Sequence, residues 1–264
     1  MRLTTIAAAA AVLTAGAASA QISTPYITVN VSNANGSGSF VVDLAGPGVI
    51  PQPDGGVVFV SSVLGPMFPM DISDSGGNVI ATLNSLISPS TADDITTPDI
   101  TDARSGLTFS IQAGGLDTEI EVVSSFIETP STLGPNPVLR ANSGYTASDT
   151  SDLNGDGIVD GDGVTVSSAG ALTEFYVNGG VDFGILFDGL NSSFSAGPFG
   201  SEAVDATTGD VVLGANVSSF QFRSAFTLSA GDTATGNFGF FAVPAPASSG
   251  LIALGGLVAA RRRR

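Results

Sequence analysis

Apolar and polar residues alternate one by one along much of this chain. The segments YITVNV (26–31) and LTFSIQ (107–112) follow this pattern, and no long stretch shows the 3.6-residue spacing of an amphipathic helix. A period of two residues marks a strand with one buried face, because successive side chains of a strand point to opposite sides of the sheet. The pattern therefore predicts an all-β fold.

Clusters of Gly, Pro, Asn, Asp and Ser separate further strand-like segments at the short intervals typical of sandwiches and barrels. About eleven short strands in one unit, residues 21–242, favour an antiparallel β-sandwich of the jelly-roll-like type. The phenylalanines on alternating positions are expected in its core. Residues 84–88 and 90–94 are each expected to form a short helical turn, and residues 87–101 a long surface loop. The further strands are expected at 39–44, 57–63, 78–83, 119–126, 172–177, 181–187, 211–215, 219–228 and 233–242.

Three residue types that carry much of protein chemistry are missing, since the 264 residues include no cysteine, histidine or lysine. Their absence excludes disulfides, Ser–His and Cys–His catalytic pairs and Ser–Lys dyads, and leaves acid–base chemistry to carboxylates and tyrosines. Residues 21–242 carry three arginines against all 24 acidic residues. A body this acidic repels nucleic acid and favours cations, so no nucleic-acid partner is expected.

The first twenty residues, MRLTTIAAAAAVLTAGAASA, have the pattern of a secretory signal peptide. One arginine precedes an apolar middle, and small residues end the segment at Ala18-Ser19-Ala20. The apolar core is too short for an ordinary membrane span, so we expect export and cleavage before Gln21.

The other end, VPAPASSGLIALGGLVAARRRR (243–264), combines two prolines, a short apolar stretch and four arginines. The apolar stretch predicts a short hydrophobic helix that is marginal as a permanent span, with the arginines on the cytoplasmic side. This tail resembles the PEP-CTERM sorting signal, with Ala245 in place of the glutamate that is usual in the family's V-P-E-P box. The residues that carry the resemblance are Val243, Pro244, Pro246, Arg261, Arg262, Arg263 and Arg264.

The resemblance implies a processing partner and a destination for the protein. In that family an exosortase-type enzyme cuts near the proline box, after transient membrane anchoring by the tail. The protein is then delivered to the cell surface or to extracellular polymer. The same tail is also labelled as the C-terminal domain of ice-binding proteins, a label that describes the tail alone.

Residues 152–163, DLNGDGIVDGDG, have the ligand spacing of a calcium-binding loop. Alternate oxygens from a tightly curled loop can surround one hard cation, and the glycine at the sixth position permits the sharp turn. The run resembles EF-hand and dockerin-like loops, although it stands alone and leads into a strand-like segment. The expected Ca²⁺ ligands are Asp152, Asn154, Asp156, Ile158 through its carbonyl, Asp160 and Asp162.

The twelfth position of this loop is Gly163, where an EF-hand has a bidentate glutamate. Asp162, Asp149, Glu174 or water are the candidates for the missing ligand. The alternative to a calcium site is a turn-rich, acidic hairpin tip with no bound ion.

A second acidic feature is the run Asp117-Thr118-Glu119-Ile120-Glu121. On a strand, Asp117, Glu119 and Glu121 project from one face. The spacing is similar to the E-x-D-x-E motif of laminarinase-like glycoside hydrolases, and a pair of carboxylates can hydrolyse a glycoside without histidine. The chain contains no tryptophan to stack on sugars, however. The alternative is a solvated strand face with Ile120 and Val122 pointing inward.

The leading functional hypothesis is non-enzymatic: an exported, surface- or matrix-associated β-sandwich with a structural or adhesive role and one calcium-stabilised loop. Extracellular polysaccharide is a candidate partner. The competing hypotheses are a carbohydrate-active enzyme that uses Asp117, Glu119 and Glu121, and a glycan-binding module without catalysis.

Overall fold

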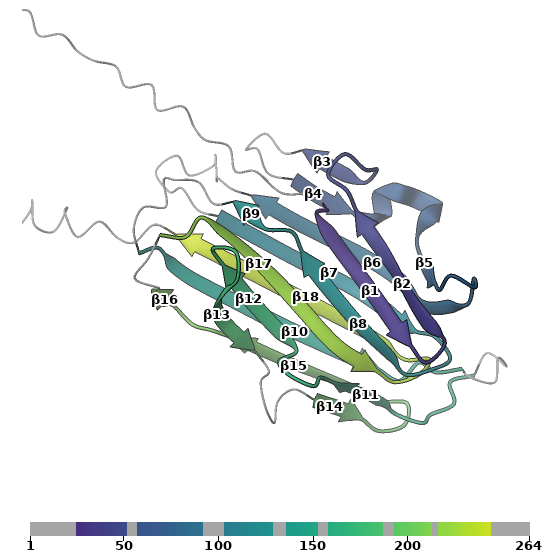
Figure 1. The fold of residues 1–264 in the computed structure, drawn as a ribbon. Helices are drawn as coiled ribbons and strands as arrows, with labels where there is room; N and C mark the ends of the chain where they lie inside the picture. Colours follow the sequence, from purple (N-terminus) through teal and green to yellow (C-terminus); the bar gives the residue numbers. More distant parts are fainter. Residues whose placement is uncertain are drawn as a thin grey trace, which may run out of the picture.

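The computed structural model shows an all-β protein built from two antiparallel sheets, which lie face to face (Figure 1). Each sheet has nine strands within the described part of the chain, and a 3-10 helix, η1 (Ser61–Met67), lies between two of them. The predicted antiparallel β-sandwich is thus confirmed. The structure describes residues 25–51, 57–91, 103–128, 136–152, 158–186, 193–212 and 216–243.

The first sheet, sheet A, runs in the order β13-β12-β17-β8-β1-β2, with β11 and β9 also paired to β17, and β14 paired to β11. Its strands are β1 (Ile27–Asn33), β2 (Gly36–Val42), β8 (Thr118–Ser124), β9 (Ile127–Glu128), β11 (Val164–Ser167), β12 (Thr173–Val177), β13 (Val181–Leu186), β14 (Ser193–Ala196) and β17 (Ser219–Leu228).

The second sheet, sheet B, runs in the order β15-β10-β18-β7-β6-β4-β3, with β16 paired to β10 and β5 paired to β6. Its strands are β3 (Val49–Pro51), β4 (Val57–Val60), β5 (Met70–Ser73), β6 (Val79–Thr91), β7 (Ala103–Ala113), β10 (Val138–Ser148), β15 (Ser201–Thr207), β16 (Val211–Val212) and β18 (Thr233–Val243).

The chain passes between the sheets at short connections. β7 of sheet B leads into β8 of sheet A, and β17 of sheet A leads into β18 of sheet B. Both pairs occupy central places in their sheets, because β8 pairs with β1 and β17, whereas β18 pairs with β7 and β10. These crossings bring the ends of strands from both sheets together at one end of the sandwich.

Several expected segments differ from the structure. Residues 84–88, expected as a helical turn, and residues 87–91 of the expected surface loop are strand, because β6 is 13 residues long and pairs with β4, β5 and β7. The first residues of the expected turn at 90–94 are strand for the same reason, and residues 92–94 lie outside the described part. The strand expected at 57–63 ends at Val60, where η1 begins.

The core between the sheets is largely aromatic. Phe226 of sheet A stacks on Phe109 of sheet B at a ring-centroid distance of 6.2 Å, and Phe220 stacks on Phe240 at 4.1 Å. These side chains are at most 4% exposed, which confirms that the phenylalanines on alternating strand positions are core residues. Gly236 is needed beside them, since a Cβ there would lie 2.5 Å from the Phe109 ring.

A network of buried hydroxyls also joins the two sheets. The Tyr145 hydroxyl on β10 donates to the carbonyl of Leu172 at 2.8 Å and lies 2.6 Å from Thr173 Oγ1 and 2.7 Å from Ser224 Oγ, both on sheet A. Ser143 lies 2.9 Å from Thr173 in the same network. Burial raises the pKa of Tyr145, so its phenol stays protonated and keeps its donor.

The ends of the chain lie outside the described residues, so the expected signal peptide at 1–20 and the hydrophobic helix within 244–264 remain predictions. No helix in the described ranges is long and apolar enough to cross a bilayer.

Tyr145→Phe is expected to lower the free energy of unfolding by about 1–3 kcal/mol, because it leaves a buried carbonyl and two buried hydroxyls short of a partner. Urea unfolding measures this loss. The matched control is Tyr176→Phe, whose hydroxyl donates to Glu174 on the half-buried outer face. An equal loss in the two variants would contradict a special role for the buried network.

Candidate functional site

Three aspartates meet at the end of the sandwich where β10 ends and β18 begins. The register that pairs Ser148 with Thr233 places Asp149, the residue after β10, beside Asp232, the residue before β18. Asp162 approaches them from the segment that precedes β11. One carboxylate oxygen of each aspartate lies within 4.8 Å of the other two. Asp149, Asp162 and Asp232 are called the acidic cluster below.

Asp149 is held by backbone donors. Its Oδ2 accepts hydrogen bonds from the amides of Phe199 at 2.7 Å and Gly163 at 3.1 Å, and its Oδ1 accepts one from the Ser151 hydroxyl at 3.3 Å. Burial opposes the charge of this carboxylate, but the hydrogen bonds outweigh it and lower the pKa of Asp149. Asp149 therefore stays ionised although it is buried.

Asp232 is fully buried and has the opposite shift. Burial is the main cause that raises its pKa, and the charges of Asp149 and Asp162 add to the effect. Its Oδ1 accepts from the Thr150 amide at 3.1 Å and its Oδ2 from the Ser229 hydroxyl at 2.5 Å, which partly offset the cost. The ionised cluster is thus under electrostatic repulsion, which a bound cation would relieve.

The spacing of the acidic cluster fits one calcium ion. Calcium takes oxygen ligands at about 2.3–2.6 Å, so oxygens on one ion can be separated by at most about 5 Å. The three oxygens meet this limit. The backbone geometry accounts for Gly163 at the twelfth loop position. Gly163 has φ +86°, and a Cβ there would lie 2.9 Å from the carbonyl oxygen of Ala196, so a glutamate would not fit.

The expected calcium ligands are thus only partly placed. Asp162 belongs to the acidic cluster. The amide of Asp160 donates to the Ser151 carbonyl at 2.7 Å, and the side chain of Ile158 is 66% exposed. Asp152 follows Ser151 and is the last described residue before the gap at 153–157. Asn154 and Asp156 lie in this gap, outside the described residues.

Among the candidates for the missing ligand, the structure brings Asp149 to Asp162. The alternative candidate Glu174 is wrong, because it pairs with Arg223 on the outer face of sheet A. Asp232 was missed in the sequence. It lies 83 residues along the chain from Asp149, and the pairing of β10 with β18 brings these two together. Its single local signal is a Gly-Asp turn before a strand.

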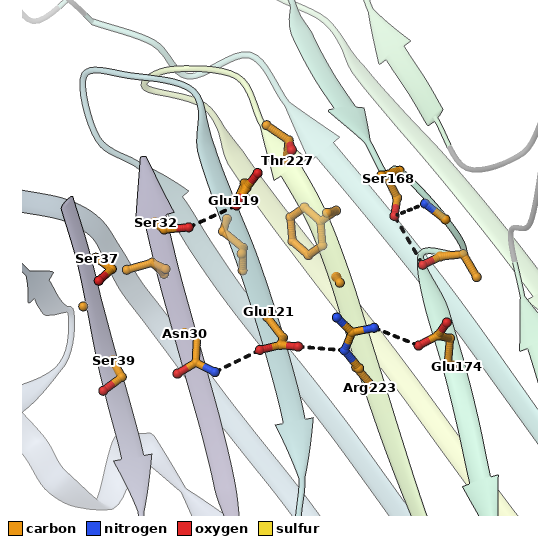
Figure 2. A pocket seen from close by; sticks show the side chains of 18 residues that line it. Asn30, Ser32, Ser37, Ser39, Glu119, Glu121, Ser168, Glu174, Arg223 and Thr227 are labelled. Carbon is orange, nitrogen blue, oxygen red and sulfur yellow. Dashed lines mark hydrogen bonds and ion pairs between the residues drawn. The ribbon is translucent and has the colours of Figure 1, made fainter. Parts of the chain in front are cut away.

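A polar depression of about 880 Å³ lies on the outer face of sheet A (Figure 2). Glu119 and Glu121 of β8 line it, while Ile120 and Val122 between and beside them are buried in the core. The predicted strand face is thus confirmed for Glu119 and Glu121, as is the inward direction of Ile120 and Val122. Asp117 does not line the depression; its Oδ1 accepts from the amide of Ala230 at 3.1 Å in the turn beyond β17.

Four planar polar side chains form a continuous row across this depression, one on each of β1, β8, β17 and β12 (Figure 2). Asn30 Nδ2 donates to Glu121 Oε2 at 3.0 Å. Arg223 Nε donates to Glu121 Oε1 at 2.7 Å, and Arg223 Nη1 donates to Glu174 Oε2 at 3.0 Å. Asn30, Glu121, Arg223 and Glu174 are called the polar row below.

Hydrogen bonds within the polar row fix the charge of its members. Burial opposes ionisation of Glu121, but its bonds with Arg223 and Asn30 outweigh burial and lower its pKa. The bond with Glu121 and the contact with Glu174 raise the pKa of Arg223. At neutral pH Glu121 is therefore a carboxylate and Arg223 a guanidinium.

Of the sorting residues expected in the tail, the structure describes Val243. It is the last residue of β18 and pairs with Val138 of β10. Pro244, Pro246 and Arg261–Arg264 lie outside the described residues, so the sorting signal stays a prediction.

A scan against protein-family models finds no match, and a search of curated proteins finds none either. Solved structures give distant similarities. TmCBM61 in complex with β-1,4-galactotriose is 11% identical over 52% of this chain and 69% of its own, with a TM-score of 0.26. The arabinose-bound MgGH51 α-L-arabinofuranosidase is 13% identical over 64% of this chain and 23% of its own, with a TM-score of 0.21.

A third similarity is to the infectious bursal disease virus Gx strain, at 12% identity over 85% of this chain and 59% of that chain, with a TM-score of 0.24. TM-scores this low do not define a shared fold.

Glu121 is expected to titrate below the ordinary glutamate pKa of about 4.3. Its charge therefore stabilises the fold above that value, and this contribution is lost as the pH falls through the lowered folded-state pKa. Carboxyl-carbon NMR titration measures it. Arg223→Gln should raise the Glu121 pKa, whereas Arg140→Gln, which breaks the exposed pair with Asp210, should not. An unchanged value in Arg223→Gln would contradict the assigned cause.

Proposed function

We propose that this chain is an exported protein of the cell surface or extracellular matrix with a structural or adhesive, non-enzymatic role. In this proposal a jelly-roll-like sandwich is braced at one end by a calcium ion. The observation that carries it is the acidic cluster, where Asp149 and Asp232 are buried and lie within ligand distance of Asp162.

A bound calcium ion would offset the electrostatic repulsion among the three carboxylates of the acidic cluster. Two buried carboxylates and a third nearby repel one another, and no arginine forms an ion pair with any of them among the described residues. Buried charges are ordinarily paired or bound to metals. In the extracellular setting calcium is abundant enough for a weak site to fill. Asp152, Asn154, Asp156, Ile158 and Asp160 of the adjoining loop would supply further oxygens.

Export and sorting are proposed from the two ends of the chain. The signal-peptide pattern at 1–20 supports secretion, and the PEP-CTERM-like tail supports processing by an exosortase-type enzyme after transient membrane anchoring. The absence of cysteine suits a secreted domain that relies on its core, and the aromatic packing between the sheets supplies that core. The protein would then remain at the surface or within extracellular polymer.

A glycosidase is the weaker candidate on chemical grounds. Hydrolysis needs one carboxylic acid whose pKa is raised so that it can protonate the leaving group. Glu121 has a lowered pKa and both its oxygens accept hydrogen bonds from Arg223 and Asn30. Asp117 lies outside the depression. Glycan binding without catalysis is favoured instead by the depression that Glu119 and Glu121 line.

Calcium is expected to raise the melting temperature of the native chain relative to the chelator-treated chain. In Asp232→Asn the calcium effect should disappear, while the calcium-free protein should be as stable as the native chain or more stable at pH 7. The neutral amide removes a charge whose raised pKa makes it destabilising once the pH exceeds that pKa. Differential scanning calorimetry with and without calcium measures both effects.

The matched control is Asp43→Asn, an exposed aspartate at the end of β2 that should keep the full calcium response. Identical melting curves of the native chain with calcium and with chelator would overturn the calcium proposal. A strong loss of calcium-free stability in Asp232→Asn would contradict the repulsion within the acidic cluster.

Mature protein recovered from the producing cells is expected to begin at Gln21 and to lack Arg261–Arg264. Intact-mass spectrometry of the surface fraction measures both ends. Replacing the four arginines with serine should leave the protein uncut. Recovery of secreted protein that keeps its arginines would contradict sorting through the tail.

A further inference from the structure

The depression on sheet A owes its shape to one small residue and one loop. Ala225, opposite Glu121 in the register of β17 with β8, lies on its floor among larger side chains. The loop Ser168–Ala171 lines one side, closed on itself by a bond from Ser168 Oγ to the Ala171 carbonyl at 3.3 Å, and β2 lines the other. A volume of about 880 Å³ is within the range of small-molecule and oligosaccharide sites.

We propose that this depression binds a neutral oligosaccharide segment that lies across the strands, with the polar row of Asn30, Glu121, Arg223 and Glu174 as its hydrogen-bonding groups. The inference rests on the adhesive role proposed above and names the surface and the ligand class through which adhesion occurs.

The spacing of the polar row suits a linear chain of sugar rings. Neighbouring strands lie about 4.7–4.9 Å apart, so the row presents one planar polar group at each such step. A sugar chain offers hydroxyl groups at a similar repeat, because each ring is about as wide as one strand spacing. Carboxylate, amide and guanidinium groups each hold two donors or acceptors in one plane, and this arrangement matches adjacent ring hydroxyls.

The charges of the depression select a neutral ligand. Glu119, Glu121 and Glu174 repel an anion, and the ion pairs of Arg223 with Glu121 and Glu174 make those two carboxylates less available to a cation. A hydroxyl both donates and accepts, so it can bond to either kind of group without carrying charge. The body of the protein, strongly acidic, further disfavours acidic polysaccharides.

The depression retains bonding capacity after its internal bonds are made. Arg223 uses Nε and Nη1 within the row, and its Nη2 has no hydrogen-bond partner among the described residues. Glu119 accepts from Ser32 through Oε2 at 3.1 Å, and its Oε1 has none in the same ranges. Ser37 and Ser39 add exposed hydroxyls on β2 at the edge (Figure 2).

The first test screens the full chain, in calcium-containing buffer, for binding to neutral oligosaccharides, acidic oligosaccharides and oligolysine. Calorimetric titration then measures the affinity for the neutral oligosaccharide that binds most tightly. Ala225→Leu should weaken binding by about tenfold or more, since it fills the floor while leaving the ion pairs in place. Arg223→Gln should weaken it to a similar degree, as expected when a ligand loses a hydrogen bond to a charged group. The matched control is Thr28→Leu, which places the same leucine side chain on the outer face of β1 outside the depression.

If Ala225→Leu has the melting temperature of the native chain and binds the neutral oligosaccharide with unchanged affinity, the proposed location of the binding site is wrong. Preferential binding of oligolysine or acidic oligosaccharides would overturn the ligand class. The proposed role is judged separately, by retention of the native chain on extracellular polymer from the producing cells. Equal retention of the native chain and Ala225→Leu would contradict the proposed binding site but would be consistent with the adhesive role. If the native chain is not retained at all, the adhesive role itself is contradicted.

Discussion

Burial of one face of each sheet against the other is the interaction on which the rest of this structure depends. Because side chains alternate along a strand, every phenylalanine directed into the core places its neighbours on the outside. On β17, Phe222 and Phe226 enter the core, and Arg223 and Ala225 are thereby held on the outer face. The polar row and its depression are consequences of the same alternation that stabilises the fold.

The strands with strong alternation could be read from the sequence, and others could not. The bounds of β17 agree with the expected segment 219–228, and β18 differs from 233–242 by one residue. β10 was missed because its buried positions include small or polar residues such as Ala141, Ser143 and Ala147, which give little hydropathy contrast. Ser143 is tolerated in the core because Thr173 is its hydrogen-bond partner, and that partner is supplied by the other sheet.

The two candidate sites differ in how far the sequence can reveal them. Glu119 and Glu121 were found because they are neighbours on one strand, but the other members of the polar row, Asn30, Arg223 and Glu174, come from three other strands. The calcium-like spacing at 152–163 is also a local signal. The acidic cluster that the structure shows is mostly non-local, since Asp149 and Asp232 meet through the β10–β18 register. Local motifs therefore indicate where to look, and strand pairing decides which side chains meet.

The position of β18 has a mechanical consequence. β18 is hydrogen-bonded on both sides, to β10 along Thr233–Val243 and to β7 along most of its length, and the chain leaves it at Val243. A pull transmitted through the residues beyond Val243 is applied along the strand, so that many inter-strand hydrogen bonds must shear together before any of them fails. A force applied across the strands at the end of an edge strand such as β15 would instead open its bonds one after another. The sandwich is thus connected to its tail through a strand well placed to bear load.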